Sequence, residues 1–251
     1  MAKAWDDFTR RYRLHEMLHR DRLARLAADS IDLMRRFHRE RGDMLMLSFS
    51  GGKDSVLMIE LARLAGIPHV PVWMAYPVFP GTMAMMRHYG VRLVHHRHWY
   101  EMWEAQYGCQ PAWSARPAMD AVIDHDRELD ALWGIRGTLV GMRRDESVKR
   151  RYALQEEIIK AKSYAGGWRC APLAAWRTDD VWAYTLGNGL PVNAQYPALV
   201  EWGADPQMLR VASIASIFLN DLPADQSKQA MRSLYPAAIN AFLADNPYVT
   251  F

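Results

Sequence analysis

The chain has 251 residues, of which 50% are hydrophobic and 24% are charged. This composition is typical of a globular protein and excludes a disordered one. Lys and Arg exceed Asp and Glu by three, 31 against 28, a surplus too small to indicate a nucleic-acid partner by itself.

The basic surplus is concentrated near the amino terminus. Residues 1–41 hold 11 Lys and Arg against 7 Asp and Glu. Apolar side chains recur at spacings of three to five between Leu14 and Phe37, which predicts helical structure over residues 4–41. The arginines among them belong either to a solvated helix face, the favoured interpretation, or to a contact with a polyanion.

Two cysteines, Cys109 and Cys170, are too few for a disulfide framework, a four-thiolate zinc site or an iron–sulfur cluster. We therefore expect no zinc and no iron–sulfur cluster. No segment approaches the roughly 18 apolar residues of a membrane span, and the first residues lack the apolar segment of a signal peptide. These features predict a cytoplasmic protein that does not associate with membranes.

Strands and helices are predicted to alternate through the middle of the chain. The expected strands are residues 44–49, 67–74, 91–95 and 138–142, and the expected helices are 55–65, 82–89 and 118–133. This alternation predicts an α/β fold with a doubly wound, mainly parallel sheet. We divide the chain into an N-terminal helical arm (1–41), a nucleotide-binding α/β domain (42–200) and a C-terminal helical extension (201–251).

A glycine loop, Ser50-Gly51-Gly52-Lys53-Asp54-Ser55, lies where the first core strand should pass into a helix. Two glycines allow a tight turn, so that backbone N–H groups and the helix amino terminus converge on an anion. Hydroxyl groups of Ser48, Ser50 and Ser55 and the charge of Lys53 add to such a site. The loop therefore predicts a phosphate site, although it is not a Walker A loop, because Asp54 follows Lys53.

The loop resembles the SGGxDS signature of the PP-loop ATP pyrophosphatases, an adenine nucleotide alpha hydrolase-like fold. Residues 141–150 resemble the GxRRxxSxxR segment of one branch, the phosphoadenosine phosphosulfate (PAPS) reductase family. Residues 168–182 resemble the Pro-Leu…Trp-Thr-x-x-Asp-Val-Trp run of the same branch, with Thr178 expected to cap a helix. Arg143 and Arg144, at a strand end, could clamp phosphate or sulfate oxygens bidentately.

The sequence departs from the reductases in two places. Their catalytic cysteine lies in a carboxy-terminal segment, but no cysteine follows Cys170 here. Gly81 stands where the family's Phe-Pro-Glu-Thr run has glutamate. Cys170, in an apolar neighbourhood, is interpreted as a buried filler. We therefore expect nucleotide handling like that of the family without its sulfur reduction.

The resemblance implies an ATP pyrophosphatase that cleaves the α–β bond to adenylylate an acceptor. ATP would bind as substrate with its pyrophosphate end on the glycine loop, and Mg²⁺ would bridge phosphate oxygens near Asp54. The expected catalytic residues are Lys53, Asp54, Arg143 and Arg144. The expected nucleotide-binding residues are Ser48, Ser50, Gly51, Gly52, Lys53, Asp54, Ser55, Gly141, Arg143, Arg144, Ser147 and Arg150.

The acceptor stays open among sulfate, a carboxylate and a nucleic-acid group, the last in a modification or defence system. Two alternative functions also stay open: a PAPS reductase with an atypical thiol, and a catalytically silent nucleotide-binding module that acts through a partner. A protein partner, nucleic acid on the basic arm and homo-oligomerisation are likewise left open.

Overall fold

The computed structural model describes residues 3–42, 44–74, 78–109, 122–123, 126–218 and 225–249. Its centre is a seven-stranded sheet with the spatial order β4-β3-β2-β1-β5-β7-β6. The strands are β1 (Met44–Ser48), β2 (His69–Met74), β3 (Arg92–His96), β4 (Val122–Ile123), β5 (Ile135–Leu139), β6 (Ile158–Lys160) and β7 (Trp168–Cys170). All neighbouring pairs are parallel except β6 and β7, so the predicted α/β fold with a mainly parallel sheet is confirmed.

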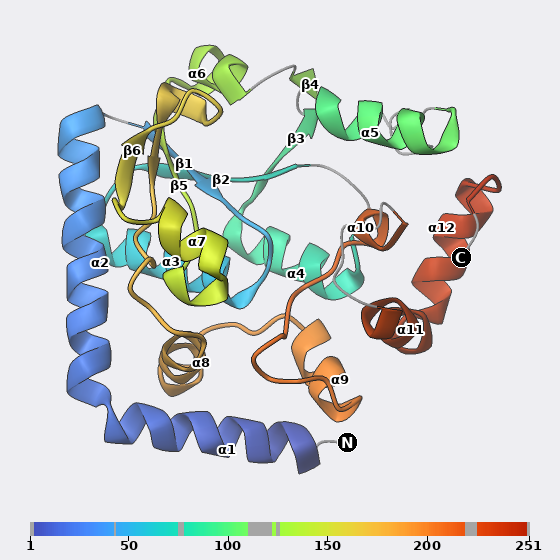
Figure 1. Ribbon diagram of the computed structural model, residues 1–251, viewed down its shortest axis with the longest axis horizontal. Helices are drawn as coiled ribbons and strands as arrows, with labels where there is room; N and C mark the ends of the chain where they lie inside the picture. The colour runs from blue at the N-terminus through green and yellow to red at the C-terminus, as the bar shows by residue number, and fades with distance from the viewer. Residues whose placement is uncertain are drawn as a thin grey trace.

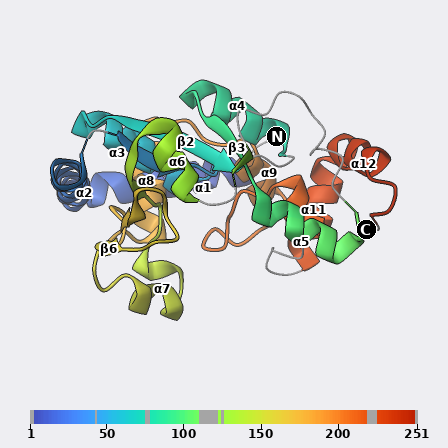
Figure 2. The same cartoon turned by 90° about the horizontal axis from the view of Figure 1, so that it is seen from above.

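Helices surround this sheet, and both ends of the chain are helical (Figure 1). They are α1 (Lys3–Leu18), α2 (Arg20–Arg41), α3 (Lys53–Ala65), α4 (Pro80–Tyr89), α5 (Arg97–Tyr107), α6 (Asp126–Trp133), α7 (Val148–Ala153), α8 (Thr178–Gly187), α9 (Gln195–Glu201), α10 (Ile214–Phe218), α11 (Asp225–Leu234) and α12 (Pro236–Asp245). Two 3₁₀ turns, η2 (Arg144–Glu146) and η3 (Ala165–Gly167), complete the described elements. α2 and α12 lie at opposite ends of the molecule in both views (Figures 1 and 2).

Side chains of β1 alternate between two hydrophobic clusters, as a strand covered on both faces requires. Leu45 and Leu47 belong to the larger cluster, which includes buried residues of α1, α2, α3 and α8. Met46 points to the opposite face and joins Leu129 of α6 and Ala165 of η3. The sheet is therefore covered by helical elements on both sides.

Most predicted elements are present with small shifts at their ends. The helix predicted over 4–41 is two helices, because the chain turns at His19 between α1 and α2. The strand predicted at 138–142 is β5, which ends earlier, at Leu139. Gly66 ends α3 in the left-handed conformation, φ 67°, which suits a glycine C-cap.

The helix predicted over 118–133 is present as α6 from Asp126 to Trp133, but the prediction is wrong at Val122 and Ile123. Val122 and Ile123 form the short strand β4, which pairs with β3 at His95 and His96, and helix begins only at Asp126. Residues 118–121 lie outside the described residues. Two residues are too few to show the period-2 pattern of a strand, so sequence periodicity could not separate β4 from the helix that follows.

The sheet order places a topological switch point beside β1. The strands that follow β1 toward one edge, β2 to β4, lie on one side of it, whereas β5 lies on its other side. In open α/β sheets, ligands bind at the carboxyl ends of the strands where the winding reverses. The segments after β1 and after β5 are therefore the ones expected to carry the site. The three-part division of the chain at residues 42 and 200 stays a prediction.

Among the described residues, no helix is both long and apolar enough to cross a membrane.

Candidate nucleotide-binding site

The glycine loop connects the end of β1 to the start of α3. Gly51 adopts φ +71°, and a Cβ there would lie 3.0 Å from the side chain of Thr82. Gly52 has an ordinary extended backbone, but its Cβ would lie 3.2 Å from both the Ser50 Oγ and the Tyr196 hydroxyl. The first glycine is therefore required by backbone conformation and the second by lack of space.

Side chains from distant segments fix this loop. The Asn193 amide donates to the Gly51 carbonyl at 3.1 Å and to the Thr82 hydroxyl at 3.0 Å. The Tyr196 hydroxyl accepts a hydrogen bond from the Lys53 backbone N–H at 2.9 Å. Burial, with the charge of Asp54, raises the pKa of Tyr196, so this hydroxyl stays protonated at neutral pH. The loop is thus held from both sides before any ligand binds.

Within the loop, the two serines Ser50 and Ser55 are connected to each other and to the backbone. The Ser55 hydroxyl donates to the Gly52 carbonyl at 2.9 Å and accepts from the Ser50 backbone N–H at 3.2 Å. The hydroxyls of Ser50 and Ser55 lie 3.3 Å apart. Together with Ser48 at the end of β1, these serines line one cavity, where the Ser48 and Ser50 hydroxyls can donate to an oxyanion.

Arg143 reaches the loop from the segment that follows β5. Its side chain is only 3% exposed, and its Nε donates to Asp54 Oδ1 at 2.6 Å. Its Nη1 donates to the Asp145 carboxylate and to the Thr178 hydroxyl, both at 3.1 Å. The other oxygen of Asp54 accepts from Lys53 Nζ at 3.1 Å. Asp54 therefore pairs with two buried cations, Lys53 and Arg143. They come from the segments that follow the adjacent strands β1 and β5.

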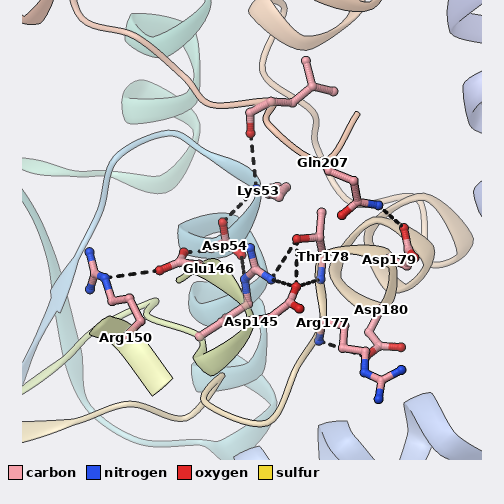
Figure 3. A network of polar contacts seen from close by, with 12 residues as sticks. Lys53, Asp54, Asp145, Glu146, Arg150, Arg177, Thr178, Asp179, Asp180 and Gln207 are labelled. Carbon is pink, nitrogen blue, oxygen red and sulfur yellow. Dashed lines mark hydrogen bonds and ion pairs between the residues drawn. The ribbon is translucent and has the colours of Figure 1, made fainter. Parts of the chain in front are cut away.

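Figure 3 shows how this network continues toward α7 and α8. Arg143 Nη2 lies 3.8 Å from Glu146, whose carboxylate in turn lies 3.5 Å from Arg150 Nε. Burial by itself raises the pKa of Asp145, but hydrogen bonds from Thr178 and the charge of Arg143 outweigh it and hold this pKa below the usual range. Asp145 is therefore ionised at neutral pH and forms an ion pair with Arg143.

Arg144 points away from this network. The backbone at Arg143 is extended (φ −127°, ψ 146°), so consecutive side chains leave it in opposite directions. Arg144 donates to the Leu154 carbonyl at 2.7 Å and pairs with Glu157 at 2.6 Å. Ser147 caps α7 by accepting the Arg150 N–H at 3.1 Å. Neither Arg144 nor Ser147 lines the cavity that the other expected residues share.

That cavity has a volume of about 630 Å³. Of the residues expected at the site, Ser48, Ser50, Gly52, Lys53, Asp54, Ser55, Gly141, Arg143 and Arg150 line it. Gly51 belongs to the same loop but does not itself line the cavity. Gly141 packs closely on Asp54, because a Cβ there would lie 3.4 Å from the Asp54 Cβ, an ordinary contact distance. The structure therefore brings the two motifs together around one cavity.

Sequence reasoning missed the wall that faces the glycine loop. It is formed by residues 207–211, which we call the outer wall and which come from the segment after α9. Lys53 Nζ donates to the Leu209 carbonyl at 3.4 Å, and the Gln195 side chain bonds both backbone groups of Ala212. No local pattern marks this segment, although Arg210 is the only Arg between Arg177 and Arg232.

The structure corrects the expected role of Thr178 and explains the glycine at position 81. Thr178 does not cap α8 as expected: Arg177 occupies that position, and the Thr178 hydroxyl bonds Arg143 and Asp145 instead. Gly81 is explained by its surroundings, because a Cβ there would lie 2.7 Å from Asn193 Oδ1. A glutamate at this position would displace the residue that holds the glycine loop.

Cys170 is completely buried in β7, and burial raises the pKa of its thiol. A buried thiol with a raised pKa is a weak nucleophile. Cys109 is partly exposed at the end of α5. The interpretation of Cys170 as a buried filler agrees with this placement.

The described residues contain no group of three or more His, Cys, Asp or Glu side chains that could hold a metal ion alone. Asp54 still has room for a role toward Mg²⁺. Each of its oxygens accepts one hydrogen bond and keeps a second lone pair, and the carboxylate lies on the cavity surface. Mg²⁺ commonly binds through one or two carboxylates together with substrate phosphates and water, which this donor set fits.

The fold and the cavity define a class: a doubly wound α/β protein with an anion-binding loop at the switch point of its sheet. Residues 44–199 match the phosphoadenosine phosphosulfate reductase domain. The matched residues are more than half of the chain. The chain belongs to this family.

Named relatives lie in sulfate activation and reduction. The chain is 27% identical to sulfate adenylyltransferase subunit 2 of Myxococcus xanthus over 221 residues, covering 72% of this chain and 68% of that protein. It is 33% identical to the adenosine 5'-phosphosulfate reductase of Oceanobacillus iheyensis over 82 residues, or 32% of this chain and 33% of that one.

A solved structure similar to this one is phosphoadenylyl-sulfate reductase from Candida auris in its phosphate complex. The two share 16% identity with a TM-score of 0.48, over 76% of this chain and 93% of that one.

Proposed function

We propose that this protein binds ATP in the cavity at the switch point and cleaves it between the α and β phosphates to adenylylate an acceptor. The observation that carries the proposal is the convergence of the glycine loop and Arg143 on one cavity from the ends of β1 and β5. Its volume of about 630 Å³ falls within the range typical of small-molecule sites.

The glycine loop would hold the pyrophosphate end of ATP. Hydroxyls of Ser48, Ser50 and Ser55 face the cavity, and the start of α3 adds the positive end of a helix dipole. Fixing these donors in advance lowers the cost of ordering them around a ligand. The contacts of Asn193 and Tyr196 with the loop support this role.

In the reaction, an acceptor oxygen would attack the α-phosphorus while the bond from that phosphorus to the bridging oxygen breaks. Pyrophosphate leaves with the electron pair. Lys53 and Arg143, which Asp54 holds side by side, would stabilise the charge that develops on the leaving group. Mg²⁺ near Asp54 would screen the phosphate charges when it is bound.

Arg144 and Ser147 have supporting positions in this proposal. Arg144 ties the segment after β5 to Leu154 and Glu157, and Ser147 orders α7, from which Arg150 reaches Glu146. They would keep Arg143 and Arg150 in place without touching phosphate.

The relative that matches over the greater length supports adenylyl transfer, 221 residues against 82 for the reductase. A sulfate adenylyltransferase subunit is by its name an adenylyl-transfer protein that works with another subunit. We therefore propose a protein partner for this chain as well. We do not extend the proposal to nucleic acid, because arm arginines such as Arg10, Arg20 and Arg22 pair with carboxylates of this chain.

Incubation with ATP and Mg²⁺, with AMP and pyrophosphate measured separately from ADP and phosphate, tests the proposal. We expect pyrophosphate to form together with an equal amount of adenylylated acceptor, or of AMP where water is the acceptor, once sulfate or another acceptor is supplied. ADP as the main product would contradict it. ATP binding without turnover under any acceptor would favour the silent-module alternative.

A thiol-based reductase is the alternative enzyme, and its test is a double substitution. Cys109→Ser with Cys170→Ala should leave nucleotide binding and turnover unchanged, because neither sulfur lines the cavity among the described residues. Wild type with reduced thioredoxin should release no sulfite from PAPS. Sulfite that appears with wild type and disappears with the double variant would restore the reductase function.

A further inference from the structure

Four cationic side chains line the cavity, and three of them are neutralised by carboxylates. Lys53 pairs with Asp54, Arg143 with Asp54 and Asp145, and Arg150 with Glu146. The fourth, Arg210 of the outer wall, makes no hydrogen bond or ion pair with any described residue. Among the described residues that line the cavity, it is therefore the one positive charge without a carboxylate partner.

The backbone that carries Arg210 is fixed on both sides. Before it, Leu209 is buried and its carbonyl accepts from Lys53 Nζ at 3.4 Å. After it, Ala212 exchanges two hydrogen bonds with the Gln195 side chain, at 3.0 and 3.1 Å. A side chain whose backbone is fixed while its guanidinium has no partner is suited to binding a ligand.

The outer wall also stands close to the glycine loop. Val211 lies 3.8 Å from the position that a Cβ of Gly52 would take. Arg210 is near enough to Tyr196, which bonds the loop, for its charge to act against the rise in the pKa of that hydroxyl. Arg210 thus lines the same cavity as the phosphate-binding loop, in a segment whose neighbouring residues contact that loop.

Two anions must approach each other in the proposed reaction, because both the α-phosphate and an oxyanion acceptor carry negative charge. The cations on the loop side are already paired with carboxylates and are assigned to the nucleotide. An exposed cation in the outer wall of the same cavity supplies the attraction that this encounter needs. Arg210 also lies beyond residues 44–199, the part shared with the family.

We propose that Arg210 is the specificity-determining residue for the second substrate, binding the oxyanion of a sulfate-like or carboxylate acceptor beside the bound nucleotide. This inference rests on the proposed function and deepens it. A guanidinium suits this task because it offers several donors in a planar fork that matches oxyanion geometry.

The test uses the full chain loaded with α,β-methylene-ATP, which cannot be cleaved at the α–β bond. Sulfate and acetate are each titrated into the loaded protein by calorimetry, so that the probe that binds identifies the acceptor chemistry. Arg210→Gln should weaken binding of that probe by about 10- to 100-fold, since a charge-assisted hydrogen bond is lost. Arg210→Lys should retain part of the affinity.

Affinity for the nucleotide analogue separates this inference from the proposed function. Arg210→Gln should leave it within about twofold of wild type. Arg87→Gln, the same change at an exposed Arg of α4 outside the cavity lining, should alter neither affinity.

Three outcomes would overturn the assignment of Arg210: neither probe binds loaded wild type, the probe binds Arg210→Gln as tightly as wild type, or Arg210→Gln weakens the analogue as much as the probe. In the third case Arg210 belongs to the nucleotide phosphates. Failure of wild type to bind the analogue would instead contradict the proposed function.

Discussion

At Gly52 the restriction on side-chain size comes from neighbouring atoms. The backbone there is extended, which any residue tolerates, yet Ser50 Oγ and the Tyr196 hydroxyl lie 3.2 Å from where a Cβ would be. Val adds two methyl groups beyond that atom. They would enter the space in which a phosphate must approach the loop.

We therefore expect Gly52→Val to abolish measurable ATP binding in calorimetry while the protein stays folded by circular dichroism. Gly66→Ala is the matched control. It costs stability because of the positive φ at that residue, about 1 kcal/mol, but nothing lies within 4 Å of its Cβ position and it is remote from the cavity lining. Unchanged ATP affinity in folded Gly52→Val would refute the assignment of the loop.

Asp145 gives the site a predictable response to acid. Its pKa is lowered from an ordinary value near 3.8, so its ionised form stabilises the folded protein. That contribution is complete above the ordinary pKa and is lost as the pH falls through the lowered value. Urea unfolding of wild type and Asp145→Asn should therefore show a stability gap at pH 6 that begins to narrow only as the pH falls below about 4. A gap independent of pH would contradict the role given to Asp145.

At the residue scale, a local sequence pattern was enough to predict that the glycine loop lies between a strand and a helix. Ser50–Ser55 could be identified because a glycine pair, a lysine and hydroxyl groups stand together at a strand-to-helix junction. Arg143 and Arg144 could not be told apart, because their separation depends on an extended backbone and on Glu157 being nearby. Arg210 could not be placed, because its position depends on hydrogen bonds from Gln195 and Lys53.

Among the elements, the N-terminal arm has a structural role beside the site. Trp182 of α8 packs edge-on against Phe8 of α1, with ring centroids 5.0 Å apart, and lies under Lys53 Nζ at 5.9 Å. Tyr12 donates to Asp179 at 2.9 Å. The N-terminal arm thus packs against α8, and Trp182 of that helix lies beneath the Lys53 ammonium group of the glycine loop. Its apolar periodicity predicted helix, but the partner it covers could not be read from the sequence.

The bond between the arm and α8 can be tested at Arg22. Its guanidinium binds both oxygens of Asp180, a carboxylate only 1% exposed. Arg22→Ala would leave that charge buried with a partner removed, so we expect a loss of about 1–3 kcal/mol in unfolding free energy.

Arg10→Ala is the matched control on the same arm. Arg10 lies 3.6 Å from Asp7, and both side chains are more than half exposed, at 80% and 55%. Exposed pairs contribute little, so a change of less than about 0.5 kcal/mol is expected in the same urea titration. Equal effects of the two substitutions would show that the arm is not held by Asp180.

For the whole molecule, the decisive feature is the order of the strands. β1 and β5 are adjacent although about ninety residues separate them, so Asp54 and Arg143, 89 residues apart in sequence, meet at the same sheet edge. The alternation of strands and helices predicted a parallel sheet but not this order. The resemblance to the family indicated that the glycine loop and the Arg143 segment act together. The parallel pairing of β1 with β5 explains why they lie side by side.

The central claim is that ATP is cleaved between the α and β phosphates at this edge of the sheet. ATP labelled on the α-phosphate and ATP labelled on the γ-phosphate, incubated in parallel with Mg²⁺ and an oxyanion acceptor and separated by thin-layer chromatography, test it most directly. We predict that the α label appears in AMP or an adenylylated acceptor and the γ label in pyrophosphate, and that both products vanish with Gly52→Val. An α label in ADP and a γ label in orthophosphate would contradict the account.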